Sequence, residues 1–112
     1  MTAAILRPMS GMTMILKVRF KPGKRDEGFA ALDEMTPVVA EEDGVLHYSF
    51  HLDMQDEDVL WAVEVYADRD ALVAHSSTDQ LKQLLATLEP LLAEPLAPAM
   101  ATPTSAGKGL PI

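Results

Sequence analysis

The residues with the greatest chemical potential lie in one short segment, which reads WAVEVYADRDALVAH from Trp61 to His75. This segment places Glu64 and Tyr66 in a strongly apolar stretch, with His75 shortly after it. The pKa of histidine lies near neutrality, which suits a general base. A carboxylate among apolar residues either has a buried partner or performs a function. The segment therefore predicts a site for proton transfer, and the alternatives are a structural role for His75 and a core position for Tyr66.

A second histidine, His47, lies in the first arm of a predicted β-hairpin, and Glu64 lies in the second arm. If Leu52 faces Val59 across the connection between the arms, then His47 faces Glu64. Such a pair either belongs to the site or only fixes the register of the strands. Arg19, on an earlier predicted strand, is another potential partner for the charge of Glu64, and we favour this structural role over substrate binding.

Metal binding is a further chemistry that the histidines suggest. His47 and His51 share one face of their strand, with Ser49 between them. A metal ion requires about three such ligands, and Glu64 is the one additional candidate. The chain contains no cysteine, which excludes thiolate sites, disulfides and a thiol nucleophile. We therefore expect no metal ion.

Three long strands must position these residues, because apolar side chains alternate over residues 12–20, 45–52 and 59–66. Only a polar connection separates the last two strands, so we expect them to form a hairpin. A weaker fourth strand is predicted within residues 96–102. Pro98 restricts that strand to a sheet edge, since proline has no N–H to donate to a neighbour.

Helical periodicity predicts helices over residues 24–35 and 68–75 and a third helix after them. Pro90 kinks or ends the third helix. Its apolar stripe consists of Leu81, Leu84, Leu85, Leu88 and Leu92.

The ends of these helices carry recognisable signals. Asp68 is a favourable N-cap for the second helix, and Ser77 with Gln80 fits a capping box for the third. Pro37 predicts a kink in the first helix, or a new start with Thr36 as the N-cap.

The composition limits the class of protein. With 112 residues and 48% hydrophobic residues, the chain is long and apolar enough for one domain with one core. The net charge of −8 argues against nucleic acid and against anionic membrane surfaces as partners. No apolar run reaches the ~20 residues of a membrane span. We expect a cytoplasmic protein, with an N-terminal extension over residues 1–11, one domain over 12–104 and a flexible or partner-bound tail over 105–112.

Three pieces of sequence together resemble the antibiotic biosynthesis monooxygenase domain family, and the resemblance covers roughly residues 12–93. These pieces are VRFKPGKRDEGFAALDEM at 18–35, EEDGVLHYSFHLD at 41–53 and VEVYADRDALVAH at 63–75. Their order matches the family's strand, PGK-like turn, helix, acidic-glycine step and Glu-x-(Trp/Tyr) strand end before a helix with histidine. The resemblance implies an α+β fold of ferredoxin-like, split βαβ type, with an antiparallel sheet. It also implies a homodimer in which two sheets pack face to face as a dimeric α/β barrel.

The resemblance further implies a monooxygenase that needs no cofactor and oxidises a quinol, anthrone or similar electron-rich aromatic with molecular oxygen. Such a site holds an aromatic ring between apolar walls, removes a proton and admits oxygen. In this reading the catalytic candidates are His75, Tyr66 and His47. The candidates for substrate binding are Glu64, Trp61, Arg19 and Tyr48. The cavity of the family lies between the sheet and the helices.

Other functions remain open at this stage. A non-catalytic dimeric module that binds a small molecule needs only the fold and a pocket. Haem degradation is a weaker alternative. The haem-degrading branch of the family resembles a pattern with an asparagine on its first strand, and this chain contains no asparagine. The region after His75 also offers no further histidine as an axial ligand. Isomerases and other enzymes of the same barrel class are weaker still.

Overall fold

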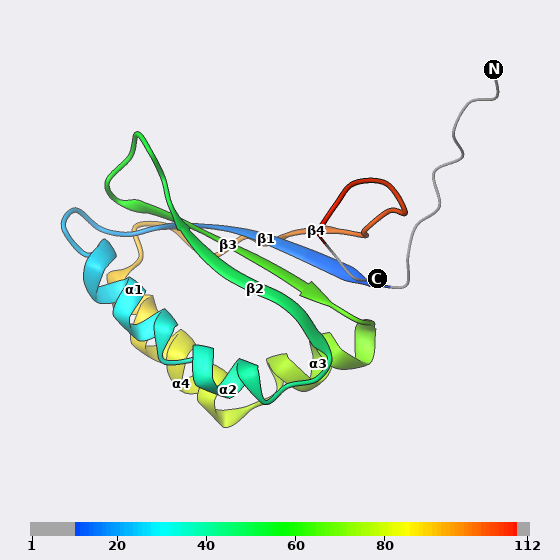
Figure 1. Ribbon diagram of the computed structural model, residues 1–112. Coiled ribbons are helices and arrows are strands. Elements are labelled where there is room, and N and C mark those ends of the chain that lie inside the picture. The colour runs from blue at the N-terminus through cyan, green and yellow to red at the C-terminus, as the bar shows by residue number, and fades with distance from the viewer. Residues whose placement is uncertain (1–10, 110–112) are drawn as a thin grey trace, which may run out of the picture.

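The computed structural model describes residues 11–109, in which helices cover one face of a four-stranded antiparallel sheet (Figure 1). Along the chain, a strand and two helices precede a hairpin, two further helices and a short last strand. This order is the split βαβ arrangement of ferredoxin-like folds, so the predicted α+β fold class is confirmed. Residues 1–10 of the predicted N-terminal extension and residues 110–112 of the predicted tail lie outside the described residues.

The elements agree closely with the predicted ones. The strands are β1 (Met12–Arg19), β2 (Val45–Leu52), β3 (Val59–Tyr66) and β4 (Ala99–Ala101). The helices are α1 (Arg25–Asp33), α2 (Thr36–Ala40), α3 (Arg69–Ser76), α4 (Asp79–Leu88) and the 3₁₀ segment η1 (Glu89–Leu91). The sheet order is β2-β3-β1-β4, which places the short strand with Pro98 before it at an edge, as predicted.

The predicted pairing of His47 with Glu64 is wrong by one residue. Tyr48 of β2 faces Glu64 of β3, whereas His47 faces Val65. Because successive side chains of a strand point to opposite faces, this shift moves His47 away from the face that carries Glu64.

The connection between β2 and β3 explains the shift. The backbone N–H of Asp53 donates to the carbonyl of Val59 at 3.1 Å, so Val59 lies beside the turn rather than beside Leu52. Leu52 therefore pairs with Leu60. The length of the polar turn sets the register, and the sequence pattern alone leaves this length open by a residue.

Two of the predicted helix starts differ in their outcome. The carboxylate of Asp68 accepts the N–H of Ala71 at 2.8 Å and caps α3, as predicted. The predicted capping box at Ser77 is wrong, because Thr78 is the N-cap of α4 and accepts the N–H of Leu81 at 3.2 Å. Ser77 instead ends α3, where its hydroxyl donates back to a carbonyl of that helix at 2.6 Å.

The prolines act at helix boundaries. Of the two predicted outcomes, a kink or a new start, the structure shows a new start at Thr36, with Pro37 as the second residue of α2 and Met35 rather than Thr36 as the N-cap. Thr36 lies inside α2, and its hydroxyl donates to the carboxylate of Asp33 at 2.9 Å. Pro90 ends α4, and the chain continues as η1.

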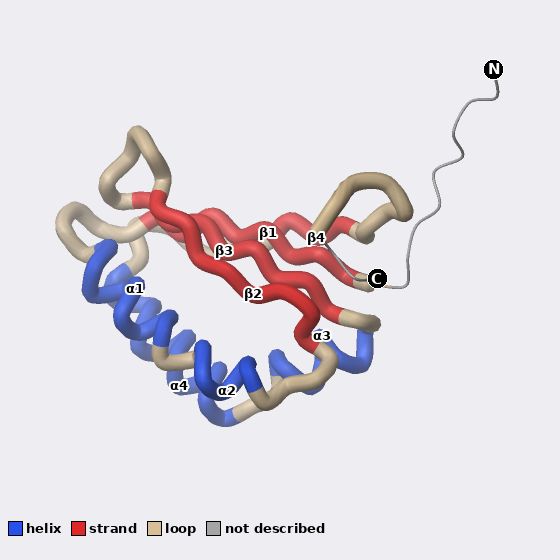
Figure 2. The backbone as a smooth tube through the Cα atoms, viewed as in Figure 1, coloured by secondary structure: helices blue, strands red, loops and turns tan. Residues whose placement is uncertain are grey.

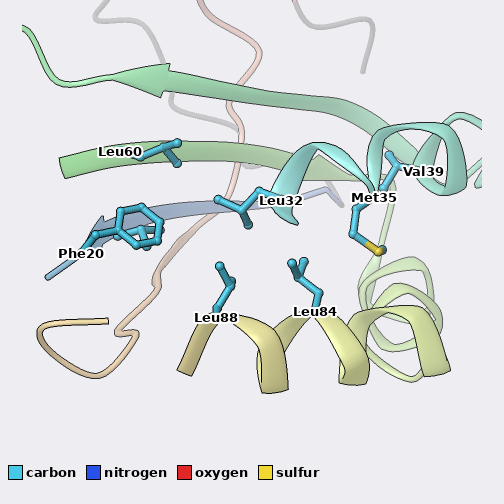
Figure 3. Close-up of a cluster of buried hydrophobic side chains, with 8 residues drawn as sticks. Phe20, Leu32, Met35, Val39, Leu60, Leu84 and Leu88 are labelled. Carbon is cyan, nitrogen blue, oxygen red and sulfur yellow. The ribbon is translucent and has the colours of Figure 1, made fainter. Parts of the chain in front are cut away.

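The core lies between the sheet and the helices α1, α2 and α4 (Figure 3). Its buried side chains include Phe20, Leu32, Met35, Val39, Leu60, Leu84 and Leu88. Gly28 of α1 lies directly against the ring of Phe20, and a Cβ added at Gly28 would be 2.0 Å from Cε1 of that ring. Glycine at this position lets α1 approach the sheet closely.

No helix of residues 11–109 lies against the opposite face of the sheet (Figure 2). Ile15 of β1 lies on this open face and is 41% exposed. An antiparallel sheet can leave one face to solvent or to a partner. Between residues 11 and 109, no helix is long and apolar enough to cross a membrane.

Candidate active site

A cavity of about 250 Å³ lies between the helix-covered face of the sheet and the helices. Its polar groups come from Tyr48, Glu64, His75 and Ser76. The apolar walls include Leu16, Phe50, Ala62, Leu84, Leu88 and Leu96. A small aromatic molecule would thus meet apolar walls on most sides and a few polar groups at one end.

The strands β2 and β3 supply the polar end of the cavity. The alternation of β3 places Glu64 and Tyr66 on one face, as the sequence predicts, and the structure shows that this is the face that the helices cover. The hydroxyl of Tyr66 donates to Oε1 of Glu64. Tyr48 lies directly opposite Glu64 on β2 and also lines the cavity. Glu64 is thus held in place by a buried phenol and is only 5% exposed.

Helix α3 adds His75, which is 3% exposed. Its Nδ1 lies 3.1 Å from Oε1 of Glu42, and its Nε2 lies 3.7 Å from Oε1 of Glu64. The ring centroid of His75 is 5.5 Å from that of Tyr66 and 5.9 Å from that of Tyr48. The imidazole therefore lies between two carboxylates and against two phenol rings.

Burial controls the protonation of these groups. It raises the pKa of Glu64 above its ordinary value of 4.5, although the hydrogen bond from Tyr66 and the charge of His75 act in the opposite direction. Burial also raises the pKa of the Tyr48 and Tyr66 hydroxyls above 10.0, and the negative charge of Glu64 raises both further. Both phenols therefore stay protonated, and the hydroxyl of Tyr66 donates to Glu64, which is more basic than an exposed glutamate.

Four of the seven predicted site residues come together. Tyr48, Glu64 and His75 line the cavity, and Tyr66 lies behind Glu64 with its side chain fully buried. The other three, His47, Trp61 and Arg19, are not among the residues that line this cavity.

His47 lies on the exposed part of β2. Its Nε2 is 2.8 Å from the hydroxyl oxygen of Ser49, which is also 2.8 Å from Nε2 of His51. The two histidines and the serine thus form a short hydrogen-bonded row, as their spacing on one strand face suggests. In the described part of the chain, no three His, Asp or Glu side chains gather closely enough to hold a metal ion.

Trp61 contributes to the turn that follows β2. Its indole N–H donates to Oδ1 of Asp53 at 2.9 Å. This bond, together with the N–H groups of Asp56 and Gln55, lowers the pKa of Asp53 to about 2. Trp61 therefore helps to fix the turn that sets the register of the hairpin.

The predicted pairing of Arg19 with Glu64 is wrong. Arg19 lies at the far end of β1, where its guanidinium contacts Asp56 at 2.7 Å and Glu94 at 3.6 Å. The residue of β1 that faces Glu64 is Met14. The carboxylates of Asp56 and Glu94 thus balance the charge of Arg19. The nearby basic partner of Glu64 is His75 instead.

Two polar residues of the site were missed by sequence reasoning. Glu42 belongs to the EEDG segment that precedes β2, which entered the family resemblance as an acidic-glycine step and not as a source of site residues. Ser76, next to His75 on α3, lines the cavity. The partner of Glu42 is 33 positions away in the sequence, so no local pattern connects the two residues.

The chain belongs to the antibiotic biosynthesis monooxygenase family, whose model matches residues 11–87. The predicted family is thus confirmed, and the match includes the strands β1–β3 and every polar residue of the cavity. None of the curated proteins is significantly similar to this chain.

Solved structures give a consistent picture. A proposed antibiotic biosynthesis monooxygenase from Chloroflexus aurantiacus is 29% identical, with a TM-score of 0.76 over 90% of this chain and 99% of the other. Another from Caulobacter crescentus is 28% identical, with a TM-score of 0.77 over 83% and 89% of the two chains. A Mycobacterium tuberculosis protein is 26% identical, with a TM-score of 0.80 over 88% and 100%.

Proposed function

We propose that this protein is a monooxygenase that needs no cofactor and oxidises a quinol, anthrone or similar electron-rich aromatic. The observation that carries this proposal is the apolar cavity with a buried histidine and a buried glutamate at one end. In such a reaction the deprotonated substrate supplies all four electrons that reduce molecular oxygen. One oxygen atom enters the product, the other leaves as water, and the substrate becomes a quinone.

The side chains of the cavity suit the steps of this reaction. His75 accepts the proton of a substrate O–H or activated C–H at Nε2, and the carboxylate of Glu64 stabilises the resulting imidazolium. Tyr48 remains protonated and donates a hydrogen bond to the oxyanion of the substrate. Tyr66 holds Glu64 in position. The apolar walls receive the ring and keep bulk water away from the reactive anion.

The same proposal includes a homodimer. The open face of the sheet is the surface that a second copy would cover, and Ile15 on this face is exposed in the single chain. A chain of 112 residues has little surplus stability, so burying a second apolar surface would add to it. In such a dimer His47 and Trp61 would lie near the interface rather than in the cavity.

Oxygen uptake tests the proposed reaction. The purified protein, treated with a chelator and without added flavin, is mixed with a panel of quinols and anthrones and compared with heat-denatured protein. We expect uptake only with folded protein. His75→Ala should lower kcat by about 10²–10⁴-fold, the usual contribution of a general base.

The matched control is His51→Ala, because His51 is exposed and contacts only Ser49 in its described hydrogen bonds. This variant should keep its turnover within about twofold of the unaltered protein, as is usual for surface changes. If no substrate is turned over but several raise the melting temperature, the protein is a binding module instead. A Soret band on mixing with hemin would favour the haem alternative.

A further inference from the structure

Glu42 is the polar residue nearest to the imidazole of His75, yet it does not line the cavity. It belongs to the turn between α2 and β2, and its Oε1 lies 3.1 Å from Nδ1 of His75. The side chain of Glu42 is 20% exposed, compared with 3% for His75. Glu42 thus approaches the buried histidine from the outside.

Two hollows of the molecule meet at this contact. His75 and Glu64 line the inner cavity, whereas Glu42 lines a separate depression between α2 and the start of β2. Among the described residues, Tyr48 alone lines both hollows. His75 therefore has its Nε2 side toward Glu64 and its Nδ1 side toward a carboxylate at the surface.

The chemistry of this contact determines which nitrogen carries the proton. An ionised carboxylate only accepts hydrogen bonds, so the neutral imidazole must donate its Nδ1–H to Glu42. Its lone pair then resides on Nε2, on the side of Glu64 and the cavity. The opposite tautomer would place two lone pairs against each other at 3.1 Å and would leave no free base on Nε2.

We propose that Glu42 is a positioning residue that fixes the Nδ1–H tautomer of His75 and so makes Nε2 the base of the site. This inference rests on the proposed function for its catalytic consequence, but the tautomer itself is independent of any reaction. Four groups face His75: Glu42 from the turn before β2, Glu64 and Tyr66 from β3, and Tyr48 from β2. Of these, Glu42 is the acceptor within hydrogen-bond distance of Nδ1.

The test compares three substitutions at one position. Glu42→Leu removes both the acceptor and the charge, Glu42→Gln keeps an acceptor oxygen without the charge, and Glu42→Asp keeps the charge on a shorter side chain. The matched control is Glu41→Leu, since Glu41 is an exposed glutamate on the same turn. Thermal unfolding checks that each variant is folded.

The first readout is the long-range ¹H–¹⁵N spectrum of the imidazole, which distinguishes the two tautomers. The unaltered protein, Glu41→Leu and Glu42→Gln should show the Nδ1–H form, whereas Glu42→Leu should show a mixture or the Nε2–H form. An Nε2–H form in the unaltered protein, or an unchanged spectrum in Glu42→Leu, would overturn the proposal. Because the unaltered protein is decisive by itself, a variant that fails to fold leaves the proposal testable.

The second readout is turnover. Glu42→Leu should lower kcat by about 10–100-fold with little change in KM, as expected for loss of a group that orients another. Glu42→Asp should recover part of this loss. Glu42→Leu could change the tautomer while neither the unaltered protein nor any variant consumes oxygen. In that case the proposed function fails, but the role of Glu42 stands.

Discussion

At the scale of single residues, the buried carboxyl group of Glu64 destabilises the fold when it is ionised, although the proposed reaction uses it. Its carboxyl group is 5% exposed, and its charged form loses most of its hydration on folding. Burial raises the pKa of Glu64, so the folded protein holds the carboxyl proton more tightly than the unfolded chain does. As pH rises through the window that begins near 4.5, the unfolded chain releases this proton first, and stability declines.

Substitution of this carboxyl group tests the argument. Glu64→Gln keeps the acceptor for Tyr66 but cannot ionise, so we expect the decline in stability above pH 4.5 to disappear. At neutral pH the variant should melt at a higher temperature than the unaltered protein, while kcat falls because the imidazolium of His75 loses a nearby carboxylate. Thermal unfolding between pH 4 and 8 measures the stability.

The exposed Glu57→Gln is the control, and it should leave the pH dependence of unfolding as it is. A melting temperature of Glu64→Gln that lies below that of the unaltered protein at every pH would contradict this account. It would mean that the charged carboxylate stabilises the fold more than its burial destabilises it.

The site residues differ in how far the sequence could reveal them. Glu64, Tyr66 and His75 lie within twelve positions of one another, and one strand and one helix start are enough to predict that they converge. The contact between Glu42 and His75 depends on a turn that brings the chain back beside α3, so it arises from tertiary packing and not from a local pattern. Which cross-strand residue faces Glu64 depends on the length of a turn, and this is why Tyr48 rather than His47 takes that place.

At the scale of elements, the contact between α1 and Phe20, which directly follows β1, depends on a missing side chain. Glycine in a helix is disfavoured relative to alanine by about 1 kcal/mol. Gly28 is nevertheless required here, because its position against Phe20 leaves no room for a Cβ. The close approach lets the ring of Phe20 remain 1% exposed beneath the helix.

Gly28→Ala should therefore lower the free energy of unfolding by about 1–3 kcal/mol, the usual range for overpacking, despite the better helix propensity of alanine. Urea denaturation measures this difference. The added substitution Phe20→Leu should make the combined loss smaller than the sum of the two single losses, because the smaller side chain gives space to the new methyl group. Strict additivity, or a Gly28→Ala variant that is more stable, would show that the helix simply moves away.

The boundaries of the elements were largely predictable for physical reasons that are local. Alternation fixed both arms of the hairpin, and Pro37 and Pro90 fixed helix boundaries, because proline cannot donate a backbone hydrogen bond. The start of α4 was less predictable, since Ser77 and Thr78 are adjacent and both can cap a helix. Ser77 is the C-cap of α3, and its hydroxyl donates to a carbonyl of that helix, whereas Thr78 has the extended backbone of an N-cap.

At the scale of the whole molecule, the two faces of the sheet have different tasks. The helix-covered face contains the cavity. The open face carries Ile15 and Val63, which face each other on β1 and β3. If a second copy covers the open face, the dimer adds stability without supplying the described walls of the cavity.

This division of tasks leads to a prediction about assembly. Ile15→Lys places a charge on the apolar part of the open face, and a lysine there cannot be buried against a second sheet without a large cost in hydration. We expect the unaltered protein to sediment as a dimer and the variant as a folded monomer with a lower melting temperature.

Val73→Lys is the control, because it makes the same chemical change on α3, where Val73 is 52% exposed and does not line the cavity. This variant should remain dimeric. Because the cavity lies on the helix-covered face and Ile15 lies on the open face, the Ile15→Lys monomer should still bind the aromatic ligand. A variant that remains dimeric would place the interface elsewhere, whereas a monomer that no longer binds ligand would mean that the partner helps to hold the cavity in shape.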